Sequence, residues 1–195
     1  MFGYSVRLLA LVSAACAVGV AQCGFPVHGA GRLLTFTFNA SVTPTATVLH
    51  ITLKFKGGPK GVEGIEVPTE WAGEKLHGIV NLRALSKGTV IAGSIIRYRP
   101  NHPVVLAYDL VKDFAGRFNY PAQFHGVVLP EYLEITGDNA LVRPKLDGRA
   151  PVTVNFDWQK IPDSWVLATS FGTDNRCQTY SGPWRDVQYA LFTAG

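Results

Sequence analysis

The sequence predicts an all-β protein, an antiparallel, β-sandwich-like domain built from short strands. Its 195 residues include 20 Gly and 12 Pro, and so many turn-forming residues favour short strands over long helices. The clearest strand runs from residue 47 to 56, where apolar and polar residues alternate with a period of two. Its apolar face comprises Leu49, Ile51, Leu53 and Phe55. A second alternating run, from 152 to 158, supports the same fold class.

Composition and charge limit the function classes. Hydrophobic residues make up 47% of the chain and charged residues 16%, which is typical of one globular domain with its own core. The formal net charge is only +4, and the sequence contains no block of like charges. We therefore expect no nucleic-acid partner.

The N-terminus is typical of a secretory signal peptide, which we place at residues 1–21. A basic segment ending at Arg7 precedes an apolar core at 8–20, and small residues follow at the positions that signal peptidase inspects. Cleavage is expected before Gln22. The apolar core is too short for a membrane span, which needs about 20 residues.

Export to a secreted or periplasmic location follows from that signal, with lipid attachment at Cys16 as the less favoured alternative. We expect residues 22–32 to form a flexible lead-in and residues 33–195 to form the β domain. Once the leader is removed, Cys23 and Cys177 remain. In an oxidising compartment they could form one disulfide, or Cys23 could stay unpaired, and the sequence leaves both possibilities open.

The remaining strands follow from alternation and turn residues. They are expected at 33–39, 89–99, 103–112, 132–136 and 140–143. The last two ranges are predicted to form a hairpin around Gly137, Asp138 and Asn139. Between them and the strand at 103–112, the segment 115–130 is predicted to be a long loop.

The stretch from Val152 to Gly172 is expected to form a second hairpin. Phe156 and Trp158 share one face of its first strand and should be buried, whereas Thr153 lies on the opposite, solvated face. Pro162 removes a backbone donor and favours a turn. Residues 165–171 would then form the returning strand.

This stretch carries a resemblance to a known family. The matching residues are Asp157-Trp158, Pro162, Trp165, Ala168-Thr169-Ser170-Phe171-Gly172, Gln178 and Ala190-Leu191-Phe192-Thr193-Ala194-Gly195. They resemble the end of the N-terminal domain in the glycyl aminopeptidase family of zinc metallopeptidases, in clan MA. Further similarities lie at Pro68, Trp71, Asn81-Leu82 and Pro130-Glu131-Tyr132. Many members carry a proline-glycine-serine-tyrosine turn near Trp71, and this sequence departs from it.

The resemblance implies a non-catalytic N-terminal β domain. Family members usually continue into a catalytic zinc domain and a PDZ domain, so this chain is expected to be truncated before the catalytic domain. The implied partner is a downstream peptidase domain or a partner chain, with a peptide substrate possible at their junction. If strand partners lie in that absent domain, the final strand at 189–194 would be an exposed edge. The alternative function is a free-standing secreted module that binds peptide or glycan.

The sequence predicts no catalytic, cofactor-binding or metal-binding residue of its own. A peptidase of this family needs a His-Glu-x-x-His helix to hold zinc. The five His of this chain include no such pair: His28, His50, His77, His102 and His125. Ser170 resembles the serine of a nucleophile elbow, but no His follows it. The carboxylate pairs Asp109/Asp113 and Glu131/Glu134 have no defined separation, and Lys54 and Lys56 are interpreted as a solvated face. Zinc is thus expected only in the missing catalytic domain.

Overall fold

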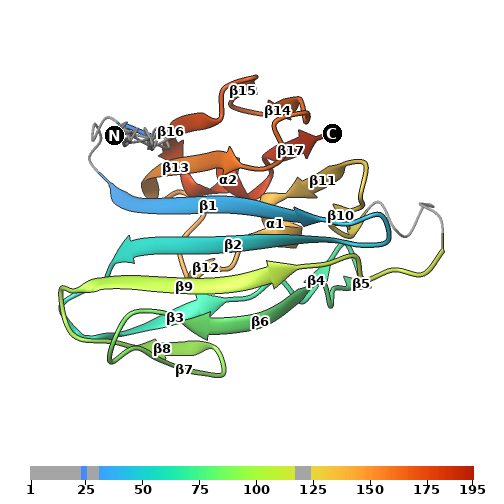
Figure 1. The fold of residues 1–195 in the computed structure, drawn as a ribbon. Helices are drawn as coiled ribbons and strands as arrows, with labels where there is room; N and C mark the ends of the chain where they lie inside the picture. The colour runs from blue at the N-terminus through green and yellow to red at the C-terminus, as the bar shows by residue number, and fades with distance from the viewer. Residues whose placement is uncertain (1–22, 26–30, 117–123) are drawn as a thin grey trace, which may run out of the picture.

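The computed structural model describes residues 23–25, 31–116 and 124–195, and it is organised around one six-stranded sheet. Strands of this sheet cross the front of Figure 1. From edge to edge the strands are β16 (Cys177–Pro183), β13 (Pro151–Lys160), β1 (Arg32–Val42), β2 (Thr47–Lys56), β9 (Pro103–Leu110) and β6 (Ile79–Ala84). The predicted signal peptide lies outside the described residues.

Smaller sheets complete the molecule. A five-stranded sheet contains, in order, β10 (Val127–Val128), β11 (Leu133–Thr136), β17 (Leu191–Ala194), β14 (Leu167–Thr169) and β15 (Gly172–Thr173). A four-stranded sheet contains β12 (Arg143–Pro144), β3 (Val62–Glu66), β8 (Ile95–Arg97) and β7 (Val90–Ala92), and a ribbon joins β4 (Glu70–Trp71) to β5 (Glu74–Lys75). The helices α1 (Gly137–Ala140) and α2 (Trp184–Gln188) are short. The all-β prediction is confirmed.

One strand pair departs from the antiparallel expectation. β1 and β13 run parallel, with Leu34 opposite Val154 and Phe36 opposite Phe156. A parallel pair needs a long connection between its strands, and here most of the domain lies between them. The pairing brings two alternating segments from opposite ends of the sequence into the centre of one sheet. Every other pairing described among the strands is antiparallel.

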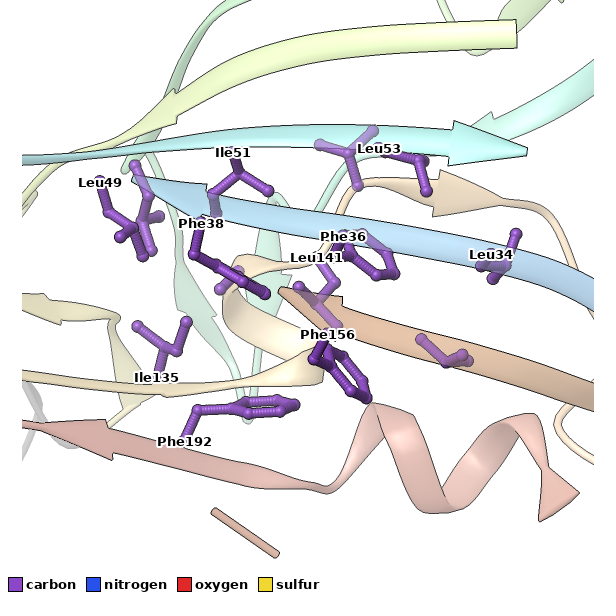
Figure 2. Packing of buried hydrophobic residues seen from close by; sticks show 14 of the residues in the cluster. Leu34, Phe36, Phe38, Leu49, Ile51, Leu53, Ile135, Leu141, Phe156 and Phe192 are labelled. Carbon is purple, nitrogen blue, oxygen red and sulfur yellow. The ribbon is translucent and has the colours of Figure 1, made fainter. Parts of the chain in front are cut away.

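An aromatic cluster fills the space between the two largest sheets. Phe38 of β1 stacks on Trp158 of β13 with ring centroids 3.6 Å apart, and Phe192 of β17 lies 5.6 Å from Trp158. Figure 2 shows Phe38, Phe156 and Phe192 pointing toward one another. All four side chains are fully buried. The predicted burial of Phe156 and Trp158 on one face is therefore confirmed.

The opposite face of β13 is also covered, which corrects the expectation that Thr153 faces solvent. Thr153 is 4% exposed and Asn155 is 3% exposed. The neighbouring strand β16 places polar side chains next to Thr153 and Asn155. Thr153 Oγ1 lies 3.1 Å from Ser181 Oγ, and Thr179 Oγ1 donates to Asn155 Oδ1 at 3.0 Å.

Neither predicted hairpin forms. The turn at Pro162 carries the chain from β13 in the six-stranded sheet to β14 in the five-stranded sheet. Likewise α1 separates β11 from β12, which belong to different sheets. A turn between two alternating segments is compatible both with a hairpin and with a crossing between facing sheets, so local sequence could not decide between them.

The last strand is central rather than exposed. β17 pairs with β11 on one side and with β14 on the other. The expected edge at residues 189–194 is therefore wrong for β17, and its backbone groups are satisfied within this chain. Tyr189, which precedes the strand, is 70% exposed.

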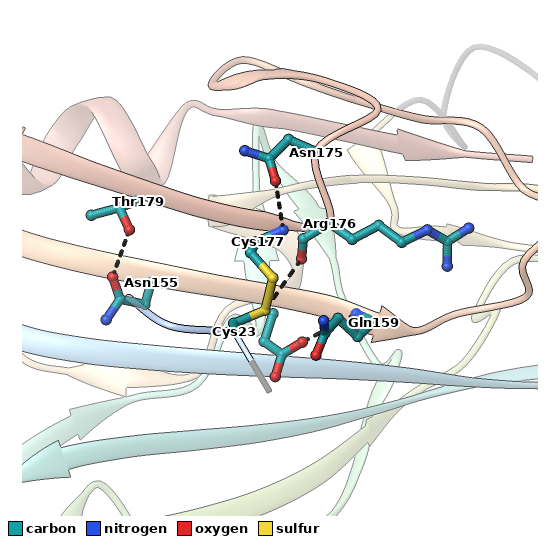
Figure 3. The surroundings of a disulfide bond; sticks show 8 residues. Cys23, Asn155, Gln159, Asn175, Arg176, Cys177 and Thr179 are labelled. Carbon is teal, nitrogen blue, oxygen red and sulfur yellow. Dashed lines mark hydrogen bonds between the residues drawn. A yellow bond between two sulfur atoms is a disulfide. The ribbon is translucent and has the colours of Figure 1, made fainter. Parts of the chain in front are cut away.

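A disulfide joins Cys23 to Cys177, which decides the question that the sequence left open (Figure 3). The two Cα atoms lie 5.5 Å apart, and the sequence separation is 154 residues. Cys177 is the first residue of β16, so the bond ties the N-terminal segment to the edge of the six-stranded sheet.

A buried tyrosine connects the six-stranded sheet to the segment that follows α1. Tyr108 of β9 donates its hydroxyl hydrogen to Ala140 O at 3.0 Å, and the same oxygen accepts from Val142 N at 3.2 Å. Burial raises the pKa of Tyr108 far above its ordinary value, so the hydroxyl stays protonated. The two bonds fix the end of α1 against the core.

Candidate functional site

The outer face of the five-stranded sheet carries exposed apolar side chains. We call this surface the C-terminal face. It comprises Tyr132, Glu134, Val166, Ala168, Leu191 and Thr193. Ala168 and Glu134 both lie opposite Thr193 in the register, so their side chains lie on the same face as that of Thr193. The side chains of Phe192 and Ala194 point to the other face of the sheet. Val166 is 64% exposed and Leu191 is 43% exposed.

A shallow depression of about 230 Å³ lies in the C-terminal face. Its lining consists of Ala168, Thr169, Ser170, Leu191 and Thr193. Ser170 Oγ accepts a hydrogen bond from Leu191 N at 2.9 Å. The serine that resembled a nucleophile elbow therefore caps the start of β17, where its hydroxyl has a structural role.

A second pocket, of about 350 Å³, surrounds a buried arginine. Arg143 Nε donates to Glu66 Oε2 at 2.9 Å, and its NH2 group donates to Asp138 Oδ1 at 3.3 Å. Burial raises the pKa of Asp138, and the charge of Arg143 opposes that effect. Because Arg143 is already bonded to two carboxylates, this cluster locks β3, α1 and β12 together and offers no free cation to a ligand.

Two of the five histidines that looked scattered in the sequence each pair with an aspartate. His50 Nδ1 lies 2.7 Å from Asp109 Oδ1, and His125 Nδ1 lies 2.6 Å from Asp113 Oδ1. The carboxylates considered as one pair in the sequence thus serve different histidines. His77 and His102 are exposed, and His28 lies outside the described residues.

Within residues 23–25, 31–116 and 124–195, no group of three or more His, Cys, Asp or Glu side chains could hold a metal ion. Glu131 and Glu134 are both exposed, and Glu134 belongs to the C-terminal face. In the same part of the chain, no helix is long and apolar enough to cross a membrane.

Sequence reasoning missed the polar cluster around Asp109. The only local signal was the polar face of the strand at 47–56, which includes His50. The cluster consists of His50 of β2, Ser41 of β1, Asp109 of β9 and Asn81 of β6. Because its members come from four strands, spacing along the chain could not identify them.

Comparisons with known proteins bear on the fold alone. No known family model matches the sequence, and no curated protein matches it significantly. Among solved structures, an aminopeptidase N family protein from Idiomarina loihiensis is similar with a TM-score of 0.59 at 14% identity. The match covers 83% of this chain and 29% of that chain. An M1 zinc metallopeptidase from Deinococcus radiodurans matches with a TM-score of 0.33 at 14% identity, over 85% of this chain and 41% of that chain.

The similarity to the Idiomarina structure, with its TM-score above 0.5, shows the fold of this chain. This chain has the fold of less than a third of that longer protein. The expected resemblance to zinc aminopeptidases is confirmed at the level of the fold.

Proposed function

We propose that this chain is the non-catalytic N-terminal β domain of a secreted or periplasmic metallopeptidase of the glycyl aminopeptidase type. Its role in the peptidase is structural: it supports a zinc-binding catalytic domain and forms one wall beside the substrate cleft. The observation that carries the proposal is the fold similarity, which extends over 83% of this chain but only 29% of the longer aminopeptidase N family protein.

The C-terminal face is the proposed contact surface for the catalytic domain. Its exposed Leu191 is the first residue of strand β17, which leads to Gly195, and its exposed Val166 is hydrogen-bonded to Gly195. A domain continuing from that residue would begin next to this apolar sheet face. Stable interfaces bury roughly 800 Å² on each partner around an apolar centre, and Glu134 would lie at the rim of such a contact.

Export is part of the proposal. The Cys23–Cys177 bond supports it, because disulfides form and persist in oxidising compartments. The zinc and its ligands belong to the catalytic domain, and this chain contributes packing and shape.

A free-standing binding module is the second candidate. A groove of about 480 Å³ beside strands β1, β2 and β9 favours it. Its lining includes Phe25, Leu33, Phe55 and the side chains of Lys54 and Lys56. An apolar floor with cations at the rim suits a peptide or glycan that carries negative charge.

We expect the purified chain alone to bind no stoichiometric zinc and to release no glycine or alanine from aminoacyl reporter substrates. A catalytic zinc needs three protein ligands and an open position, and the described residues provide no such group. Elemental analysis and an aminopeptidase assay test this. Turnover that a chelator abolishes would overturn the non-catalytic assignment.

The docking proposal predicts a stable complex with a specific partner. The DNA downstream of the Gly195 codon should encode a His-Glu-x-x-His segment, and the domain containing it should co-purify with this chain. Leu191→Lys should weaken the complex by about 10-fold or more, because it places a charge in an apolar contact. Isothermal titration calorimetry gives the affinity.

Val90→Lys is the matched control for that experiment. Val90 is 58% exposed on β7 of the four-stranded sheet, away from the C-terminal face. The affinity should not change in this variant. Equal weakening by both substitutions would reject the assigned face, and absence of any zinc-peptidase segment downstream would favour the free-standing module.

A further inference from the structure

Three neighbouring strands of the six-stranded sheet place a serine, a histidine and an aspartate in one hydrogen-bonded chain. Ser41 Oγ of β1 lies 3.1 Å from His50 Nε2 of β2, and His50 Nδ1 lies 2.7 Å from Asp109 Oδ1 of β9. Ser41 is exposed, the His50 side chain is 41% exposed, and the Asp109 side chain is 12% exposed. Exposure to solvent therefore increases along the cluster, from the buried carboxylate of Asp109 to the accessible hydroxyl of Ser41.

The hydrogen bonds fix which histidine nitrogen carries the proton. Burial alone would raise the pKa of Asp109, but hydrogen bonds from Asn81 and His50 and the charge of Arg83 hold it below its usual value. The carboxylate can only accept, so His50 Nδ1 donates to it. His50 Nε2 is then free to accept the proton of Ser41 Oγ, which is the arrangement that general-base activation of a serine requires.

An irregularity in β6 supports the aspartate. The register of β6 against β9 shifts between Val80 and Arg83, so the chain bulges at Asn81. Asn81 has a positive φ of 56°, an uncommon conformation for a residue other than glycine. The bulge aims Asn81 Nδ2 at Asp109 Oδ2, with a separation of 2.7 Å. Bulges commonly redirect a side chain next to a functional site, and this one orients the acid.

We propose that Ser41 is a nucleophile that hydrolyses esters of short acyl groups. His50 activates Ser41, and Asp109 orients His50. This activity is separate from the proposed function, because it needs no zinc and no partner domain. Ser41 lies on an open sheet surface, where Asn39 opposite His50 is also exposed. An open surface accommodates a bulky alcohol portion and gives no burial to a long acyl chain, which selects the short-acyl class.

The reaction balances with water as the only co-reactant. Ser41 Oγ bonds to the ester carbonyl carbon while its proton passes to His50 Nε2. His50 returns that proton to the alcohol oxygen as the carbon–oxygen bond breaks. Water then attacks the acyl-serine and gives a proton to His50. That proton returns to Ser41 Oγ as the acid leaves.

Covalent labelling of the full-length chain tests the proposal. A fluorophosphonate probe should modify Ser41, as located by peptide mass spectrometry, and 4-nitrophenyl acetate should release a burst of one 4-nitrophenol per chain. His50→Gln should slow both reactions by about 100-fold, the scale of general-base assistance. Asp109→Asn should also slow them, since it removes the acceptor that fixes the histidine tautomer.

Ser94→Ala is the matched control, because Ser94 is an exposed serine outside the cluster. This variant should react at the wild-type rate, and Ser41→Ala should show no burst. Absence of labelling at Ser41, equal labelling of Ser94, or a rate that His50→Gln leaves unchanged would overturn the proposal. Circular dichroism of each variant shows whether unfolding causes a loss of reactivity. If Asp109→Asn does not fold, His50→Gln still tests the proposal, because His50 lies at the surface.

Discussion

Trp158→Ala should lower the free energy of unfolding by about 3–5 kcal/mol. Trp158 is fully buried, stacks on Phe38 and contacts Phe192 from the facing sheet. Truncation would leave a cavity between two sheets whose strands are fixed by their own ladders, so the site could collapse only partly. The loss should appear as a lower denaturation midpoint in urea.

Two further variants separate packing from other effects. Trp71→Ala removes the same side chain from the partly exposed β4–β5 ribbon and should lower the free energy of unfolding by less than half as much. Trp158→Phe keeps a ring over Phe38 and removes Nε1, which is buried without a hydrogen-bond partner among the described residues. It should retain more than half of the stability that the alanine variant loses. Equal losses for Trp71→Ala and Trp158→Ala would contradict the central place of Trp158 in the core.

Removing the Cys23–Cys177 bond should lower the free energy of unfolding by about 2–5 kcal/mol. The bond closes a loop across 154 residues, nearly the whole domain. A cross-link of that span restricts the unfolded chain far more than the folded one, in which the two cysteines already lie near the same sheet edge. The double variant Cys23→Ser/Cys177→Ser should therefore unfold at a lower denaturant concentration than the wild type.

Reduction provides an independent check of the same bond. The wild-type protein in dithiothreitol should reach the midpoint of the double variant, and the double variant should not respond to the reductant. A loss below about 1 kcal/mol in the double variant would show that the cross-link does not constrain the unfolded chain.

The strand faces were readable from sequence because alternation is a local property. Leu49, Ile51, Leu53 and Phe55 face the core as their spacing predicts, and so do Phe156 and Trp158. Each side chain in a strand points opposite to its neighbour whatever strand lies beside it. The fold class could be predicted for the same reason, from many alternating segments separated by Gly and Pro.

Partner choice between strands was decided only by the tertiary structure. The turn at Pro162 connects two sheets rather than two paired strands, and β13 pairs in parallel with β1. Thr153 was expected to face solvent because it is polar, yet it is only 4% exposed. Period two fixes which face a residue is on, but it does not specify which strand lies alongside.

The polar cluster around Asp109 shows the same division most clearly. Alternation along each strand places the side chains of Ser41, His50 and Asp109 on the outward face. Ser41 and His50 are 9 residues apart and His50 and Asp109 are 59 apart, so no motif spacing links them. Their alignment depends on the register of β1 against β2 and of β2 against β9, together with a bulge in β6 that aims Asn81. Register is a property of whole paired strands in contact, and it therefore exists only once the sheet has formed.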